Sequence, residues 1–100
     1  DGRRMSTPLK SNEIEAALQN LDGWKQDGDK LTKAFKTKDF RSAMAFLVRL
    51  SYEAESMDHH PEIWNVYNNI TISLCTHDAG DKVTQKDVDL AGRIDSIPAA

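Results

Sequence analysis

The spacing of apolar residues alternates between a helical and an extended period, and this alternation constrains the fold more than any other feature. Residues 11–21 and 40–56 carry apolar side chains three or four positions apart, which is typical of amphipathic helices. Each segment precedes two short strand-like stretches, within 24–36 and 63–77. A last helical segment begins at Thr84. The order α-β-β-α-β-β-α predicts an α+β fold: a four-stranded antiparallel sheet with three helices packed on one face.

Polar capping residues indicate where each helix begins. Ser11 or Asn12 can cap the first helix, and Asp39 can cap the second. Thr84 can cap the third, and Asp87 follows it at the spacing of a capping box. The sequence therefore carries a start signal for every predicted helix.

Two hairpins are predicted between the helices. Asp27-Gly28 is the strongest short turn signal in the chain, and it lies between strands predicted at 24–26 and 31–36. The second hairpin is predicted from strands at 63–67 and 70–77.

The second hairpin has a register that its apolar residues predict. These residues are all even-numbered: Trp64, Val66, Ile70, Ile72 and Leu74. Because cross-strand partners share a face, a three-residue loop would pair Val66 with Ile70 and Trp64 with Ile72. We therefore expect a loop of odd length with one asparagine in the left-handed conformation.

The size and composition of the chain indicate one soluble domain at residues 9–98. Residues 1–8 are expected to be a cloning remnant and a flexible N-terminus. The net charge of −3 disfavours direct nucleic-acid binding, and no apolar run predicts a membrane segment. Cys75 is the single cysteine, so no intrachain disulfide can form, and a cytoplasmic location is expected.

All three histidines lie in one quarter of the chain. His59 and His60 precede Pro61, whose ring disfavours a helical conformation at His60. His77 lies at the predicted end of a strand. Three interpretations stay open from the residues alone: histidines without a shared role, a three-histidine zinc site whose rings Asp58, Asp78 or Glu55 orient, and metal-free acid–base catalysis.

Five motifs resemble one known family. They are "FKTKDF" at 35–40, "DHHPE" at 58–62, "NVYN" at 65–68, "TISLCTHD" at 71–78 and "KDVDLA" at 86–91. Together they are similar to the pterin-4a-carbinolamine dehydratase family over residues 9–97. The resemblance implies an enzyme without a metal or other cofactor. Its members eliminate water from 4a-hydroxytetrahydropterin and return quinonoid dihydropterin, which recycles the cofactor of aromatic amino-acid hydroxylases.

The resemblance also implies roles for individual residues. His59, His60 and His77 would be the catalytic trio, with His60 as the principal proton donor and acceptor, His59 assisting and His77 orienting the pterin. The implied substrate-binding residues are Asp58, Pro61, Cys75, Thr76 and Asp78. Glu55 and Asp87 would support the histidines.

The family's pattern further implies partners. Members form homodimers or homotetramers, and some bind the dimerisation helix of a homeodomain transcription factor, which would add a nuclear location. The chain departs from the family where Ile63 precedes Trp64, since the tryptophan usually follows Pro-Glu directly. The segment from His77 to Thr84 is one residue longer than usual.

Overall fold

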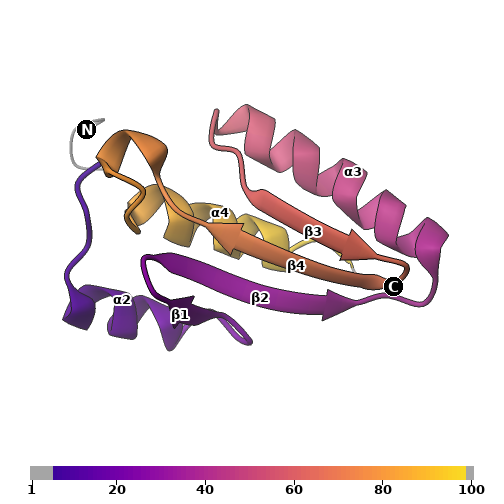
Figure 1. The fold of residues 1–100 in the computed structure, drawn as a ribbon, viewed down its shortest axis with the longest axis horizontal. Helices are drawn as coiled ribbons and strands as arrows, with labels where there is room; N and C mark the ends of the chain where they lie inside the picture. The colour runs from indigo at the N-terminus through magenta and orange to yellow at the C-terminus, as the bar shows by residue number, and fades with distance from the viewer. Residues whose placement is uncertain (1–5, 99–100) are drawn as a thin grey trace.

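The computed structural model describes residues 6–98. This part of the chain forms three α-helices, α2 (Ser11–Leu18), α3 (Phe40–Ser56) and α4 (Gln85–Asp95), and four strands, β1 (Lys25–Asp27), β2 (Lys30–Lys36), β3 (Glu62–Val66) and β4 (Asn69–Leu74) (Figure 1). A short 3-10 helix, η1 (His77–Ala79), follows β4. The predicted element order is confirmed. Of the expected N-terminal remnant, residues 1–5 lie outside the described residues.

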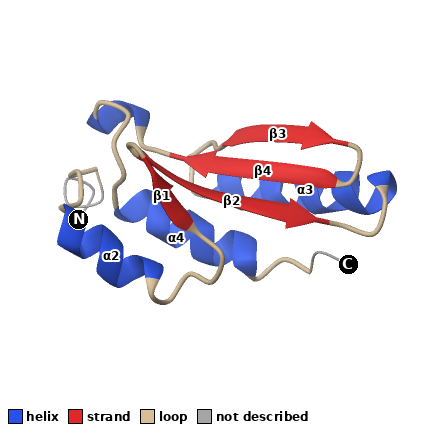
Figure 2. Cartoon of the chain, turned by 60° about the horizontal axis from the view of Figure 1, so that its bottom comes forward, coloured by secondary structure: helices blue, strands red, loops and turns tan. Residues whose placement is uncertain are grey.

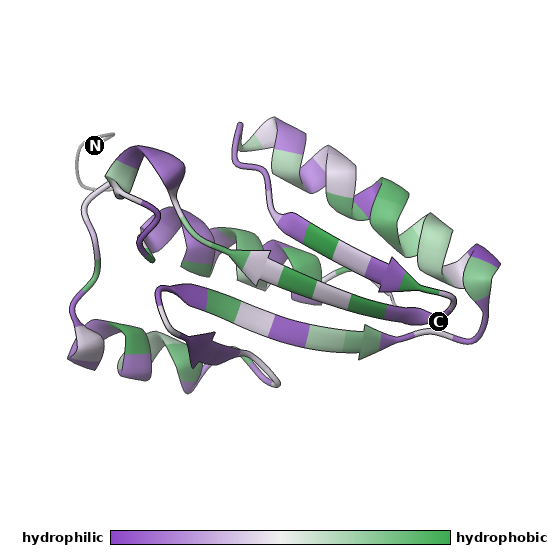
Figure 3. Ribbon diagram, viewed as in Figure 1, coloured by the Kyte–Doolittle hydropathy of each residue, from purple (hydrophilic) through white to green (hydrophobic). Residues whose placement is uncertain are grey.

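The strands form one antiparallel sheet in the order β1-β2-β4-β3. Figure 2 shows α3 and α4 beneath this sheet, and α2 near β1. Along β4 hydrophobic and hydrophilic residues alternate (Figure 3), and its apolar residues are buried in the core together with residues of the helices. The fully buried centre of the core includes Leu31, Phe46, Leu50, Ile72, Leu74, Leu90 and Ile94. Within residues 6–98, no helix has the length and apolar character that a membrane crossing requires.

The caps of α3 and α4 are those that the sequence predicts. Asp39 accepts a hydrogen bond from the backbone N–H of Ser42 at 2.8 Å. Thr84 accepts one from the N–H of Lys86, and its own N–H donates to the carboxylate of Asp87 at 2.8 Å. The capping box of α4 is therefore complete, and its acidic member lies inside the protein.

The start and the end of α2 differ from the prediction. Lys10 occupies the N-cap position, and its backbone N–H donates to the carboxylate of Glu13 at 2.8 Å, so neither Ser11 nor Asn12 is the cap. The helix ends at Leu18 instead of Leu21, because the N–H of Leu21 bonds the carbonyl three residues before it, in a tighter turn. Leu21 still packs into the core.

The register predicted for the second hairpin is wrong. Val66 pairs with Asn69 and Trp64 with Thr71, across a two-residue turn that begins at Tyr67. Tyr67, and not an asparagine, has the left-handed conformation, with a φ of 53°. Trp64 and Val66 consequently lie on the sheet face away from the helices, 54% and 55% exposed.

A buried asparagine explains this register. The Nδ2 group of Asn68 donates to the backbone carbonyl of Thr37 at 2.8 Å, and the N–H of Thr37 donates to the carbonyl of Asn68 at 2.9 Å. Leaving this buried amide unpaired would destabilise the folded protein by about 1–3 kcal/mol. The turn is thus held against the segment that precedes α3, and this long-range contact overrides the apolar pattern.

The left-handed conformation of Tyr67 predicts a difference between two substitutions. Tyr67→Ala removes the ring but keeps a Cβ atom, whereas Tyr67→Gly removes both. Because the left-handed region costs a non-glycine residue about 1–2 kcal/mol, partly offset by the greater freedom of glycine in the unfolded chain, we expect the Gly variant to be more stable than the Ala variant by about 0.5–1 kcal/mol. Urea unfolding of both variants measures this difference, and equal stabilities would contradict it.

Candidate active site

The C-terminal end of α3 turns the chain so that His59 enters the protein. The N–H of Asp58 donates to the carbonyl of Glu55, and the N–H of His59 donates to the carbonyl of Ala54, both at 3.0 Å. These two bonds form a Schellman motif, in which the residue after the C-cap is usually glycine. Here that residue is Asp58, with a φ of 50°. The motif determines where the backbone of His59 lies.

A buried carboxylate receives the side chain of His59. His59 is 7% exposed, Asp87 is 0% exposed, and Nε2 of His59 lies 2.6 Å from Oδ1 of Asp87. The second carboxylate oxygen accepts from the hydroxyl of Thr76 at 2.9 Å and from the N–H of Thr84 at 2.8 Å. Asp87 therefore joins the segment after α3, the segment after β4 and the start of α4.

This network determines which nitrogen of His59 is free. Because a carboxylate accepts hydrogen bonds, Nε2 carries a proton, and in the neutral ring the lone pair is therefore on Nδ1. Every buried side-chain nitrogen and oxygen in residues 6–98 has a partner, and Nδ1 of His59 bonds no described residue. Nδ1 is therefore accessible to solvent, and His59 lines a cavity.

The segment after β4 forms the other wall of this cavity. The predicted strand 70–77 ends at Leu74, because Thr76 leaves the sheet and pairs with Lys82 across a turn. His77 then begins the 3-10 helix η1 and is exposed. The end of the predicted strand is therefore a turn, which directs Thr76 inward and leaves His77 at the surface.

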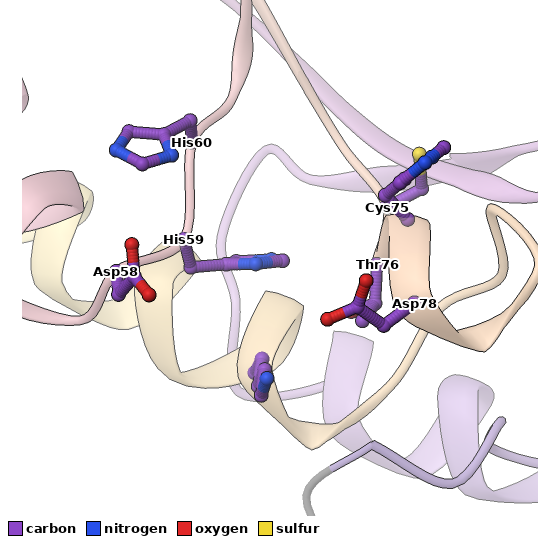
Figure 4. A pocket seen from close by; sticks show the side chains of 8 residues that line it. Asp58, His59, His60, Cys75, Thr76 and Asp78 are labelled. Atoms are coloured by element: carbon purple, nitrogen blue, oxygen red, sulfur yellow. The ribbon is translucent and has the colours of Figure 1, made fainter.

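The cavity has a volume of about 200 Å³ and contains most of the predicted site residues. Its lining comprises Asp58, His59, His60, Cys75, Thr76, His77, Asp78 and Lys86. In Figure 4 the ring of His59 extends from its loop toward Thr76 and Asp78, and the ring of His60 lies on the other side of that loop. Sequence reasoning missed Lys86, although it lies within the "KDVDLA" motif, because nothing in its spacing marked it.

Three predicted residues lie outside this lining. Pro61 and Glu55 line a neighbouring apolar groove of about 420 Å³, which shares His60 with the cavity. Asp87 reaches the site through its hydrogen bond to His59.

Two exposed histidines each contact a carboxylate. Nε2 of His60 lies 2.8 Å from Glu55, and Nδ1 of His77 lies 3.0 Å from Asp81. The hydrogen bond to Glu55, assisted by the charges of Glu55 and Asp58, raises the pKa of His60. The hydrogen bond to Asp81, assisted by the charges of Asp81 and Asp78, raises the pKa of His77. Both rings therefore retain a proton to higher pH than a free histidine.

Cys75 has the opposite character to a reactive thiol. It is half-buried, and burial together with the negative charge of Asp87 raises its pKa. Since the thiolate is the nucleophile, this residue remains a protonated, weakly reactive thiol at neutral pH. In the cavity wall, the S–H group of Cys75 is thus a weak hydrogen-bond donor.

Metal binding has no support from the side-chain geometry. Among the described residues, no group of three or more His, Cys, Asp or Glu side chains is arranged to hold a metal ion. His59 and His60 also point to different sides of their loop, each with its own carboxylate. The geometry instead offers imidazoles in different protonation environments around one small cavity.

Fold and site together define an α+β protein with a histidine-lined cavity suited to proton transfer. The chain belongs to the pterin 4 alpha carbinolamine dehydratase family, whose model matches residues 7–97. A relative from Opitutus terrae that carries the provisional name pterin-4-alpha-carbinolamine dehydratase is 48% identical over 93 residues, which cover 93% of this chain and 96% of that protein.

Two solved structures are similar to this one. A transcriptional coactivator/pterin dehydratase from Brucella melitensis has a TM-score of 0.86 and 36% identity, and the match covers 90% of this chain and 97% of that one. A pterin dehydratase-like protein, identified as a RuBisCO assembly factor in the alpha-carboxysome, has a TM-score of 0.63 and 25% identity, covering 74% and 87%. The family's fold is therefore associated with more than one described role.

The buried network predicts a large loss of stability for Asp87→Ala. The change leaves His59, Thr76 and the N–H of Thr84 without their acceptor, and each unpaired buried donor costs about 1–3 kcal/mol. We expect the free energy of unfolding, measured in urea, to fall by at least about 3 kcal/mol.

The control for this variant is on the same helix. Asp89 is exposed and accepts one hydrogen bond from Gln85, so Asp89→Asn should change stability by no more than about 0.5 kcal/mol. A similar small change for Asp87→Ala would show that the buried network contributes little.

Proposed function

We propose that the chain is a 4a-hydroxytetrahydrobiopterin dehydratase, which eliminates water from the 4a-carbinolamine by histidine acid–base catalysis without a metal. The product is quinonoid dihydropterin, so the enzyme would recycle the cofactor of aromatic amino-acid hydroxylases. The observation that carries the proposal is the cavity between two distant segments, whose lining includes His59, His60 and His77 in a chain of this family.

The elimination requires two proton transfers. The hydroxyl group on carbon 4a must gain a proton to leave as water, and the adjacent ring nitrogen must lose one. The raised pKa of His60 suits the first transfer, since a protonated ring at neutral pH can donate to the hydroxyl. The lone pair on Nδ1 of His59 suits the second, because Asp87 holds the proton on Nε2. His60 is thus the principal donor, and His59 assists as acceptor.

The remaining residues bind and orient the pterin in this proposal. His77 lines the same cavity as His59 and would direct the ring, while Asp58, Cys75, Thr76 and Asp78 line the space that the ring would occupy. Pro61 flanks the site from the neighbouring groove. Glu55 supports His60 through its hydrogen bond.

The proposal predicts that His60→Ala slows the elimination. Loss of a general acid typically costs about a hundredfold or more in rate, so kcat measured by stopped-flow loss of the 4a-carbinolamine should fall by about that factor. His60 is exposed, and the free energy of unfolding should therefore hardly change.

Matched variants make this test specific. His59→Ala and His77→Ala should also slow the reaction, whereas Asp89→Asn, which is not part of the cavity lining, should not. An unchanged kcat in His60→Ala would refute its role, and equal rates with and without the wild-type protein would refute the dehydratase proposal.

A second candidate role is protein binding, which exposed apolar side chains on α3 and β3 favour. Val48 and Tyr52 lie one turn apart on α3, 56% and 74% exposed, and Ile63 is 48% exposed on β3. Monomeric proteins rarely expose such groups together. We propose that this surface joins copies of the chain into a homodimer or homotetramer, or takes the dimerisation helix of a transcription factor.

Oligomerisation through α3 predicts a change in mass when charge is introduced there. Analytical ultracentrifugation should give a dimer or tetramer for the wild type and a smaller species for the Val48→Lys, Tyr52→Lys double variant, because buried unpaired charge opposes association. Asn12→Lys, on the exposed face of α2, is the control. A monomeric wild type would contradict the homo-oligomer. Retention of the dimerisation helix in a pull-down would support the transcriptional role.

A further inference from the structure

The turn that follows η1 brings one acidic residue against His77. The N–H of Gly80 donates to the carbonyl of His77 at 3.0 Å. The N–H of Asp81 donates to the carbonyl of Thr76, also at 3.0 Å. With Gly80 left-handed at a φ of 76°, these bonds have the pattern of a Schellman motif. A 2.8 Å bond from the N–H of Thr76 to the carbonyl of Lys82 ties the base of the turn.

The backbone of this turn brings Asp81 next to His77, although the two side chains are largely exposed, 64% and 92%. Asp81 has a φ of 61°, a conformation that residues other than glycine, asparagine and aspartate seldom adopt. Its Oδ1 atom lies 3.0 Å from Nδ1 of His77. Since the carboxylate accepts, Nδ1 carries the proton, and Nε2 is the nitrogen that remains for another partner.

We propose that Asp81 is a positioning residue, which holds His77 by Nδ1 and so presents Nε2 to the cavity as a hydrogen-bond donor to an acceptor atom of a heterocyclic substrate. This role of Nε2 rests on the proposed dehydratase function, but the contact that positions His77 does not. While the ring is protonated, Nε2 donates; after deprotonation the bond to Asp81 keeps the proton on Nδ1, and Nε2 can only accept.

The charges around His77 support this proposal. The hydrogen bond to Asp81 is the largest cause that raises the pKa of His77, ahead of the charge of Asp78. The other titratable or charged groups that line the cavity are Asp58, His59, His60, Cys75 and Lys86. The contact with Asp81 is therefore the main interaction that favours the charged ring of His77.

Two variants of Asp81 test the contact in the free protein. Asp81→Asn keeps a residue that tolerates the left-handed region but removes the charge, and Asp81→Gly removes the side chain where glycine is well accommodated. NMR titration of the three histidines should show the pKa of His77 falling toward its ordinary value in both variants. The pKa of His60, held by Glu55, should stay unchanged. The ring ¹⁵N shifts should also show that the neutral ring of His77 no longer favours the Nδ1–H tautomer in Asp81→Gly.

The control perturbs the same turn without touching His77. Asp29 contacts Lys82 at 3.0 Å, so Asp29→Asn removes a carboxylate beside the turn and leaves the pKa of His77 unchanged. An unchanged pKa in both Asp81 variants would overturn the proposal, as would an equal fall in Asp29→Asn. A lower stability in Asp81→Gly with an unmoved pKa would assign Asp81 a purely structural role.

The pH dependence of the proposed reaction provides a second, independent test. In Asp81→Asn, the fall of kcat/KM at alkaline pH should begin at a lower pH, because protonated His77 is lost earlier. If the wild type does not consume the carbinolamine but its His77 pKa depends on Asp81, the dehydratase proposal fails and the contact stands. If the wild type is active and the pKa of His77 does not depend on Asp81, the dehydratase proposal stands and the positioning role of Asp81 fails.

Discussion

One buried carboxylate, that of Asp87, holds the site together. A carboxylate without exposure is stable only when its oxygens receive several hydrogen bonds, and three donors from three parts of the chain supply them. In an ordinary capping box the acidic residue lies at the surface and satisfies one N–H at the start of a helix. In this protein the same carboxylate also fixes Thr76 and the ring of His59. The start of α4 is therefore both a structural cap and the support of the cavity.

Left-handed backbone positions after α3 and η1 determine the direction of the residues that follow them. Asp58 after α3 and Gly80 after η1 close two Schellman motifs, and the residues that follow them are His59 and Asp81. Aspartate at such a position costs more than glycine, and strained conformations persist where the surrounding contacts hold them. The side chain of Asp58 lines the cavity, where glycine could not contribute a carboxylate. Asp58 thus combines a strained backbone position with a carboxylate in the cavity wall.

Local signals predicted most of the fold, apart from the ends of α2, and the wrong hairpin register has a long-range cause. Asp39 and the Thr84–Asp87 pair act within one helical turn, so the starts of α3 and α4 could be read from the sequence. The register of the second hairpin depends on the contact between Asn68 and Thr37, thirty-one residues apart, and periodicity carries no trace of it. The bond between His59 and Asp87 spans twenty-eight residues. The family resemblance marked both residues and implied that Asp87 supports the histidines, but the structure is needed to show that its partner is His59.

The three histidines occupy different electrostatic environments, and this difference is what acid–base chemistry needs. Two imidazoles in matched environments would have the same intrinsic proton affinity, so nothing would determine which ring holds the proton and which accepts one. His59 is buried and its tautomer is fixed by Asp87, whereas His60 is exposed beside Glu55, which favours its protonated form. Each histidine has a carboxylate partner, but Asp87 is buried with His59, whereas Glu55 and His60 are both exposed. In the proposed mechanism, adjacent residues thus supply the proton acceptor and the proton donor, because the turn after α3 sends one ring inward and the other toward solvent.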